Sequence, residues 1–506
     1  MAKYRYLANN IALFSISNFV SKILVFLLVP FYTNVLSTAD YGIADVFQTT
    51  LLLLVPALTI NMGEAALRFG IENAKQRGLI LRIGLKYVLR ASLFVIAGAV
   101  VAAFFLPLRL VILFVILFFT NAVYEFLILY FQGCELVKVV VVGSVFSTVL
   151  LICSNLLFLL VWKLGLTGYL VSQMIAYAGA AGLMLTLAGK LHKEIFLQMG
   201  QKKEFEKELL AYGKPMILYS TGAWINNAAD RYFVSALCGL AVNGLYGVAY
   251  KIPSILTVFQ RIFAQAWQMS ATKERPMESS QQTADNALAK EENPQPEAAQ
   301  NENQRDVKNS REIKQSGFYS NMYRFYFSFM VLGCSFLILI VRPLAFFLFR
   351  KDFFEAWRFV PPLLISVVFG AMTGFLGSIC LAYKDSKAMG LATGIGAAVN
   401  VILNALLIPG LSAMGAAIAT AVSYFVMYAM AFWFVRKYIR LEVDMARGLL
   451  AVLLLVIEAV VMVNGAGDAV TYVICGGSFL VLLAIYLKWI KEIVGILIDR
   501  IKKIKN

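Results

Sequence analysis

Long hydrophobic runs, separated by short polar segments, follow one another along most of the 506-residue chain. Each run holds about 20 mainly apolar residues, the length that a helix needs to cross a hydrocarbon core about 30 Å thick. The pattern predicts an all-α, polytopic membrane protein with about fourteen transmembrane helices. The expected spans lie near residues 7–34, 41–63, 85–106, 110–132, 138–161, 166–189, 211–238, 242–270, 318–349, 358–383, 387–408, 411–435, 446–464 and 469–490.

The Lys and Arg residues between these spans predict the orientation. With the N-terminus inside, most basic loop residues fall on the cytoplasmic side. The outside segments then hold only Arg109, Lys163, Arg342, Arg350, Lys351 and Arg358. Because cytoplasmic loops are enriched in Lys and Arg, both termini are expected in the cytoplasm. The segment 350–358, RKDFFEAWR, is the one basic stretch expected outside.

Two pairs of similar segments indicate an internal repeat. NVLSTADYGIADVFQTT (34–50) resembles LCGLAVNGLYGVAYKIPS (237–254), and SNLLFLLVWKLGLTGYLVSQMIAY (154–177) resembles LNALLIPGLSAMGAAIATAVSY (403–424). Each pair occupies equivalent positions in two blocks of six helices. Two six-helix lobes with a pseudo-repeat are typical of transporters, which bind substrate near the membrane midplane between the repeats.

The repeat and the polar segments divide the chain. The predicted parts are an N-lobe at 1–190, a cytoplasmic linker at 191–210, a C-lobe at 211–436, two further spans within 437–490 and an amphipathic basic tail at 491–506. An insert at 271–317 interrupts the C-lobe; it has no aromatic residue, three prolines and mixed charge. Such a segment buries too little apolar surface to offset its ordering entropy, so we expect it to be disordered on the cytoplasmic side.

Composition supports the membrane assignment and excludes several other classes. Hydrophobic residues make up 60% of the chain and the mean hydropathy is +0.76. The net charge of +16 is explained by the cytoplasmic loops, so no nucleic-acid partner is expected. The chain has no CxxC pair, one His (His192) in a charged loop and no P-loop, which argues against a metal site and against its own ATP hydrolysis. No cofactor is expected, apart from H⁺ or Na⁺ as a coupling ion.

Charged residues within the spans are the candidate functional residues. The stretch TGAWINNAADRYFV (221–234) places Asp230 and Arg231 side by side, with Asn227 one helical turn before Arg231. A charge at the bilayer centre costs about 2.5–3.5 kcal/mol, so such residues usually face a cavity. Adjacent helical residues point in different directions, so these two are not expected to neutralise each other easily. The alternative is an ion pair or polar network that only holds helices together.

Further cations occur on two other faces. Lys22 shares a helical stripe with Asn18 in the first span, and Lys251 and Arg261 lie on one polar ridge of the eighth. Together with Arg231 they would suit a diphosphate, since Arg offers a forked donor and Lys a point charge. For Arg261 the alternative is a side chain that reaches to the membrane interface.

Acidic residues are candidates for gating or ion coupling. Glu64 and Arg68 lie one turn apart at the inner end of the second span, as an ion pair or a gate. Asp230 is a further gate or coupling candidate. Other carboxylates within or near spans, each a candidate proton or sodium site, are Asp45, Glu125 and Glu458.

Two stretches carry a family resemblance. NVILNALLIPGLSAMGAAIATAVSY and ADRYFVSALCGLAVNGLYGVAYKIP resemble the span eleven to twelve and span seven to eight regions of polysaccharide flippases. Nearly all of residues 5–490, apart from the insert, resembles a Wzx-type exporter of the multidrug/oligosaccharidyl-lipid/polysaccharide (MOP) superfamily. The resemblance implies a V-shaped pair of lobes that flips a polyprenyl-diphosphate-linked oligosaccharide across the bacterial plasma membrane by alternating access. The substrate would be a capsule, O-antigen or exopolysaccharide repeat unit.

Other functions remain open at this point. They are a peptidoglycan lipid-precursor flippase, a cation-coupled drug antiporter of the same superfamily, a membrane glycosyltransferase and a structural membrane protein. A drug antiporter would favour an acidic cavity, and an enzyme would need a carboxylate cluster or a catalytic loop. Besides the lipid-linked sugar, the expected partners are membrane lipids and the polymerase and glycosyltransferases of the same pathway.

The orientation is tested by cysteine labelling. In a variant without the native cysteines, Gln295→Cys should resist a membrane-impermeant maleimide added to intact cells and react after permeabilisation, because the insert is expected in the cytoplasm. Rapid labelling in intact cells would reverse the predicted topology.

Overall fold

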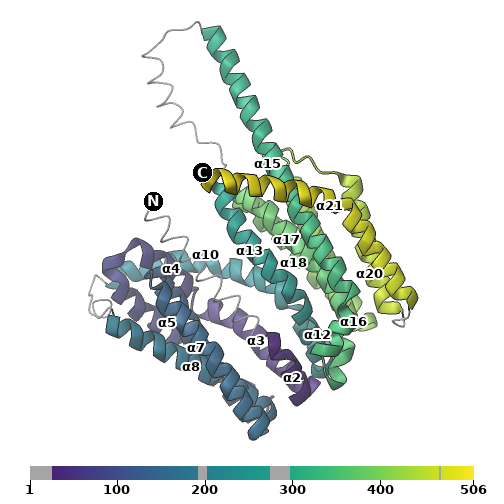
Figure 1. Ribbon diagram of the computed structural model, residues 1–506. Coiled ribbons are helices and arrows are strands. Elements are labelled where there is room, and N and C mark those ends of the chain that lie inside the picture. The colour runs from purple at the N-terminus through teal and green to yellow at the C-terminus, as the bar shows by residue number, and fades with distance from the viewer. Residues whose placement is uncertain (1–25, 192–201, 274–296, 384, 466–468, 506) are drawn as a thin grey trace. The chain divides into compact units, whose positions relative to one another are not determined.

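The computed structural model describes residues 26–191, 202–273, 297–383, 385–465 and 469–505, and its regular structure is helical throughout these ranges (Figure 1). Eleven helices among the described residues are long and apolar enough to cross a membrane. The predicted all-α, multi-pass fold class is confirmed; three of the fourteen expected spans are not among these eleven.

Most helices of the first half of the chain lie near predicted spans, whereas α4 lies between the second and the third. In chain order they are α2 (Val29–Val35), α3 (Thr38–Leu58), α4 (Met62–Glu72), α5 (Arg77–Ala102), α6 (Leu108–Gly133), α7 (Val137–Asn155), α8 (Gly165–Leu191), α10 (Lys202–Ala228), α11 (Asp230–Cys238) and α12 (Leu240–Ala249). A short 3₁₀ segment, η1 (Ala74–Gln76), precedes α5, and a π-helical segment, η2 (Leu156–Val161), follows α7. The two short loops expected near 35–40 and 239–241 are tight turns. At the second, Gly239 has φ +90°, a conformation that favours glycine.

The second half is also helical. Its elements are α13 (Lys251–Lys273), α15 (Glu297–Leu339), α16 (Val341–Leu348), the 3₁₀ segment η3 (Lys351–Phe359), α17 (Val360–Ala382), α18 (Ser386–Leu411), α19 (Ala413–Val435), α20 (Met445–Asn464) and α21 (Ala469–Lys505).

The chain divides into two compact units. Unit 1 comprises Met1–Lys251, Ala345–Ala356 and Val401–Ala416. Unit 2 comprises Ile252–Leu344, Trp357–Asn400 and Ala417–Asn506. The helices of the expected seventh span therefore group with the first six, a division that the repeat did not indicate.

The three remaining expected spans differ from the eleven in two ways. Most of the span 7–34 lies outside the described residues. The spans 211–238 and 242–270 are each divided into two helices, α10 with α11 and α12 with α13. Both carry charged and amide side chains that reduce their hydropathy, so neither qualifies on composition alone.

Part of the hydrophilic insert has regular structure. Residues from Glu297 onward form the first turns of α15, in contrast to the disorder expected from composition; residues 274–296 lie outside the described residues. Figure 1 shows this part of α15 projecting past the other helices of unit 2. The helix begins directly after Pro296, and the sequence that follows is rich in Ala, Glu, Gln, Lys and Arg, which favour helix. Likewise, α10 already begins at Lys202, within the expected linker, and α21 continues through the basic tail.

A very close helix crossing joins α3 to α12 in unit 1. A methyl group added at Gly42 would overlap the carbonyl oxygen of Leu240, and one added at Gly244 would overlap that of Thr38. The two contacts are reciprocal, so the backbones meet at a pair of glycines. Small residues allow such approach between helices in a membrane. The crossing lies within the repeated Tyr-Gly segments and brings the two copies together.

The basic segment near residue 350 packs on the turn between α2 and α3. The hydroxyl of Thr33 donates to the carbonyl oxygen of Leu348 at 3.0 Å, and the backbone N–H of Arg350 donates to that hydroxyl at 3.1 Å. The ammonium group of Lys351 donates to the carbonyl oxygen of Asn34 at 2.7 Å. These contacts give the basic stretch a structural role within unit 1.

The glycine crossing can be tested by adding one carbon. Gly244→Ala should lower the melting temperature of the purified protein, because Ala must push α3 and α12 apart. The control is Gly98→Ala, where nothing lies within 4 Å of the added methyl. That change should be neutral or stabilising by up to about 1 kcal/mol from helix propensity. Equal melting temperatures for the two variants would show that the crossing is not tight.

Candidate functional site

A short interruption in the seventh expected span positions the Asp–Arg pair. α10 ends at Ala228 and α11 begins at Asp230, so Asp230 lies in the first turn of a new helix. A carboxylate is favourable there because it complements the unpaired N–H groups and the positive end of the helix dipole. The Asp230 Oδ1 atom accepts the backbone N–H of Arg231 at 2.9 Å.

Arg231 lies between two carboxylates of unit 1. Its Nε atom is 2.8 Å from Oδ2 of Asp45 on α3, and its Nη1 atom is 3.4 Å from Oδ1 of Asp230. The guanidinium also packs over the ring of Tyr250, 4.4 Å from the centroid. The expectation that adjacent Asp230 and Arg231 do not easily contact each other is wrong, because the interruption before α11 lets Asp230 turn back onto the helix start.

Two tyrosines hold the other oxygen of Asp230. Tyr246 and Tyr250, one turn apart on α12 and its C-cap, donate their hydroxyls to Oδ2 at 2.5 and 2.8 Å. Their hydroxyl oxygens are 3.0 Å apart, and their rings meet edge to face. With the Asp230 side chain only 3% exposed, these bonds replace the water that a carboxylate would otherwise need.

Asp45 is packed against α12. The amide of Asn243 donates to Asp45 Oδ2 at 3.5 Å and to the carbonyl oxygen of Gly42 at 3.2 Å. A methyl group at Gly247 would lie 2.8 Å from the carboxylate carbon of Asp45, so the absence of a side chain there makes room for the acid. The ammonium group of Lys251 also interacts electrostatically with Asp45.

Together, these residues form a cluster of polar side chains around three buried residues, Asp230, Asn243 and Tyr246. We call it the buried polar cluster and define it as these three with the partly buried Asp45, Arg231, Tyr250 and Lys251. Its two acids balance its two bases, so the cluster is formally neutral. A buried charge that loses its partner costs several kcal/mol. Any anion that binds Arg231 must therefore compete with Asp45 and Asp230, and any proton taken up here must change the pairing.

Among the described residues, the structure does not show the other predicted binding residues beside Arg231 and Lys251. Lys22 and Asn18 lie outside the described residues, as does the side chain of Asn227. Arg261 is exposed on α13, in unit 2. The predicted convergence of cations on a diphosphate therefore stays a prediction.

The remaining acidic candidates have varied surroundings. Arg68 is exposed and pairs with Glu72 at 3.3 Å, one turn further along α4, while Glu64 lies in the first turn of that helix. Glu125 is exposed on α6. In unit 2, Glu458 on α20 is fully buried and accepts a hydrogen bond from the hydroxyl of Ser335 at 2.7 Å. The roles of these residues in gating or coupling stay predictions.

The sequence pointed to Asp230 and Arg231 but not to the residues around them. In the sequence, nothing distinguishes Asn243, Tyr246 and Tyr250 from the other residues of an apolar helical hairpin. The available signal was the Tyr-Gly repeat: Gly247 and Asp45 lie in its two copies, and the structure places them in contact. The similarity of the two segments does not by itself show that they pack on each other.

Comparison with known proteins assigns the family. The family model described as polysaccharide biosynthesis protein matches residues 7–268, a segment that contains the whole buried polar cluster. The chain belongs to this family. No curated protein matches the sequence.

Solved structures with the same fold are known. A lipid II flippase, MurJ, in an inward closed conformation superposes with a TM-score of 0.64 over 94% of this chain and 99% of the other, at 15% identity. An inward-facing multidrug resistance MATE family transporter of the MOP superfamily superposes with a TM-score of 0.59 over 82% of this chain and 94% of the other, at 11% identity. The chain therefore has the same fold as these two proteins.

The pairing in the cluster can be tested by a double-mutant cycle. Arg231→Gln leaves two acids without their cation and should destabilise the purified protein by about 3–5 kcal/mol, the usual loss for a broken buried pair. Asp45→Asn alone should cost less, since Arg231 keeps Asp230. In the Arg231→Gln background, Asp45→Asn should restore part of the melting temperature. Strictly additive losses would contradict the ion pair.

Proposed function

We propose that this protein flips a polyprenyl-diphosphate-linked oligosaccharide from the inner to the outer leaflet of the bacterial plasma membrane by alternating access. The observation that carries the proposal is the polysaccharide biosynthesis family match over residues 7–268. The fold supports it, because the solved structure with the same fold over 94% of this chain is a lipid II flippase. The substrate of that protein is, like the one proposed here, a lipid.

The buried polar cluster would act as the part that senses the headgroup. A diphosphate carries more charge than one carboxylate and accepts the bidentate fork of Arg more strongly. It would draw Arg231 away from Asp45, with Lys251, Lys22 and Arg261 as further predicted ligands. Asp45, once released, would need a proton or another cation, which would connect headgroup binding to an H⁺ or Na⁺ step.

Two other transported substrates fit the same fold. The first alternative is a peptidoglycan lipid precursor, which has the same diphosphate chemistry. The likeness to the lipid II flippase structure supports it. The second alternative is a drug moved by a cation-coupled antiporter, which the likeness to a multidrug resistance MATE family transporter supports. The neutral cluster of this chain argues for the lipid substrates, because Arg231 already compensates the acids that would attract a cation.

The proposal is tested with the purified chain alone in proteoliposomes. A fluorescent polyprenyl-diphosphate oligosaccharide in the inner leaflet should become accessible to a membrane-impermeant quencher, well above the rate in protein-free vesicles. A peptidoglycan precursor with the same label and a cationic dye in a dye-efflux assay form the two comparison arms. Faster movement of either one, or hydrolysis of the headgroup, would overturn the assignment.

Arg231 variants test the sensing role in the same assay. Arg231→Ala should reduce flipping at least about tenfold, and Arg231→Lys should recover part of it, because charge survives without the forked geometry. Lys203→Ala, an exposed cation on α10, is the matched control and should flip normally. Melting temperatures are measured alongside: if the losses of flipping only follow losses of stability, the cluster is structural and does not sense the substrate.

A further inference from the structure

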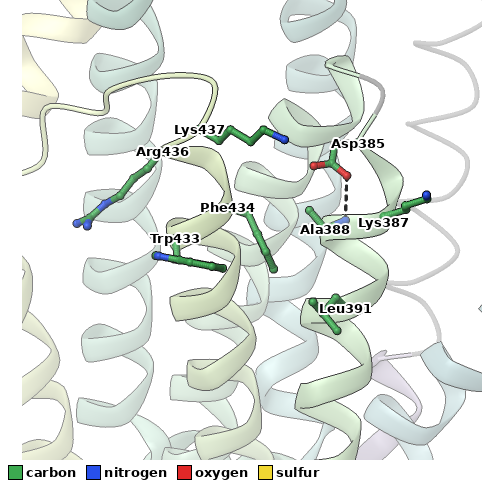
Figure 2. Close-up of a pocket in the computed structure, with 8 residues that line it drawn as sticks. All are labelled: Asp385, Lys387, Ala388, Leu391, Trp433, Phe434, Arg436 and Lys437. Carbon is green, nitrogen blue, oxygen red and sulfur yellow. Dashed lines mark hydrogen bonds between the residues drawn. The ribbon is translucent and has the colours of Figure 1, made fainter.

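Ionisable side chains at the helix ends of unit 2 have polar surroundings. Figure 2 shows one such end, around a pocket beside the start of α18, where Asp385 accepts the backbone N–H of Ala388 at 3.0 Å. In the same view Lys387 and Arg436 point in opposite directions, away from each other. Helix ends and the membrane interface accommodate such groups. Glu458 differs from them, because it lies well inside α20, a helix long and apolar enough to span a membrane.

The side chain of Glu458 is part of an otherwise apolar, buried stripe. The other members of the stripe recur at helical spacing along α20: Ala451, Leu455, Ala459 and Met462. Glu458 itself is 0% exposed, and α20 packs on α15, α17 and α21. An ionised side chain is costly in such a place unless a partner compensates its charge.

One hydrogen bond reaches the carboxyl group of Glu458. Its Oε1 atom lies 2.7 Å from the hydroxyl of Ser335 on α15, and its buried Oε2 atom has no hydrogen-bond partner among the described residues. An ionised carboxylate would therefore leave a charged oxygen without a donor. A protonated carboxyl can instead donate from Oε1 to the Ser335 hydroxyl, so only a neutral carbonyl oxygen stays unpaired. That arrangement is far less costly.

The neighbouring helices supply no counter-charge at this level. Residues 325–339 of α15, 360–382 of α17 and 469–487 of α21, all within the described ranges, contain no Asp, Glu, Lys, Arg or His. The titratable groups that interact with the carboxyl are two buried thiols, Cys334 on α15 and Cys475 on α21. On α17 the one thiol, Cys380, interacts with Asp385 instead.

The nearest basic residue along these helices is already engaged. Arg342 follows α15 and donates to the carbonyl oxygens of Gly465 at 2.5 Å and Met462 at 3.4 Å, at the end of α20. Its guanidinium also lies over the ring of Trp357, 4.1 Å from the centroid. Arg342 therefore stabilises the end of α20 and is not hydrogen-bonded to Glu458.

These surroundings favour a proton over a metal cation. Hard cations take several oxygen ligands. Around Glu458 the described side chains offer its own carboxyl, the hydroxyl of Ser335 and two thiols. A proton needs only the carboxyl and one acceptor, which the Ser335 hydroxyl provides.

We propose that Glu458 is a proton-binding site of unit 2, protonated in this conformation, and that release of its proton to water loosens the packing of α20 on α15. A glutamine would make the same hydrogen bond but could not ionise, so the carboxyl makes this helix contact dependent on pH. The site shares no residue with the buried polar cluster of unit 1, and the proposal does not depend on which substrate is transported.

Infrared spectroscopy of the purified full-length protein tests the protonation state. At neutral pH the wild type should show the C=O stretch of a protonated carboxyl, shifted in D₂O, and Glu458→Gln should remove that intensity. The control Glu208→Gln changes an exposed acid on α10 and should leave the band unchanged. A band that survives in Glu458→Gln would mean that Glu458 is ionised and would overturn the proposal.

Thermal melting tests the link to stability. The folded protein holds this proton at neutral pH, whereas an unfolded chain would release it, so raising the pH favours unfolding. From about pH 6 to about pH 9, the melting temperature of the wild type should fall relative to that of Glu458→Gln, and Glu208→Gln should follow the wild type. Parallel curves for the wild type and Glu458→Gln would refute the link. So would failure of Glu458→Gln to fold, because a neutral acid tolerates replacement by its amide.

The flanking thiols report where the loosening occurs. Two variants retain a single cysteine, either Cys475 beside Glu458 or Cys380 on α17, each with and without Glu458→Gln. At about pH 9 a maleimide should modify Cys475 at least about fivefold faster with Glu458 than with the glutamine, and at about pH 6 equally fast, because only the acid opens the contact. Modification of Cys380 should not depend on residue 458. Equal rates at Cys475 at both pH values, or the same acceleration at Cys380, would contradict a local effect on α20.

Discussion

The ion pair between Asp45 and Arg231 is the constraint on which unit 1 depends. An unpaired charge is costly in an apolar interior. The helices α3 and α11 must therefore keep the carboxylate of Asp45 and the guanidinium of Arg231 in contact, at 2.8 Å. That distance requires the glycine contacts of α12, since a side chain at position 247 would occupy the space of the Asp45 carboxylate. The tyrosines of the same hairpin then satisfy Asp230. The Asp45–Arg231 ion pair, the break between α10 and α11 and the glycine contacts of α12 therefore depend on one another.

Such an arrangement would suit the proposed function, in which the protein changes conformation inside a membrane. An interior held only by apolar contacts would offer a polar headgroup nothing to bind, and an unpaired cation would be costly while the site is empty. A neutral cluster with exchangeable partners would avoid both difficulties, because an incoming anion could take the place of Asp45 at Arg231 while a proton or a cation neutralises the released carboxylate. In the structure the guanidinium has two carboxylates and an aromatic ring around it, so alternative partners lie within reach.

The fold was largely predictable from sequence, and the site only in part. Hydrophobic runs of membrane-spanning length define helices almost regardless of context, which is why α3, α5 through α8 and α17 through α20 fall near their expected ranges. The broken helices at Ala229 and Tyr250 were missed because hydropathy averages over such interruptions. The pairing of Arg231 with Asp45 was missed for another reason: the residues are far apart in sequence, and only the packing of one repeat on the other brings them together. For the insert, composition indicated disorder, yet the helix-forming residues after Pro296 continue α15.

The pairing of Asp45 with Arg231, which is made much later in the chain, has a consequence for biosynthesis. Asp45 enters the translocon long before Arg231 and α12 have left the ribosome, so the acid must first reside in the membrane without its cation. It would do so in the protonated form or at the lipid interface, as a short-lived, incompletely packed intermediate. Segments synthesised later still, Ala345–Ala356 and Val401–Ala416, also belong to unit 1. Unit 1, which contains the candidate site, is therefore completed only after most of the chain has been made.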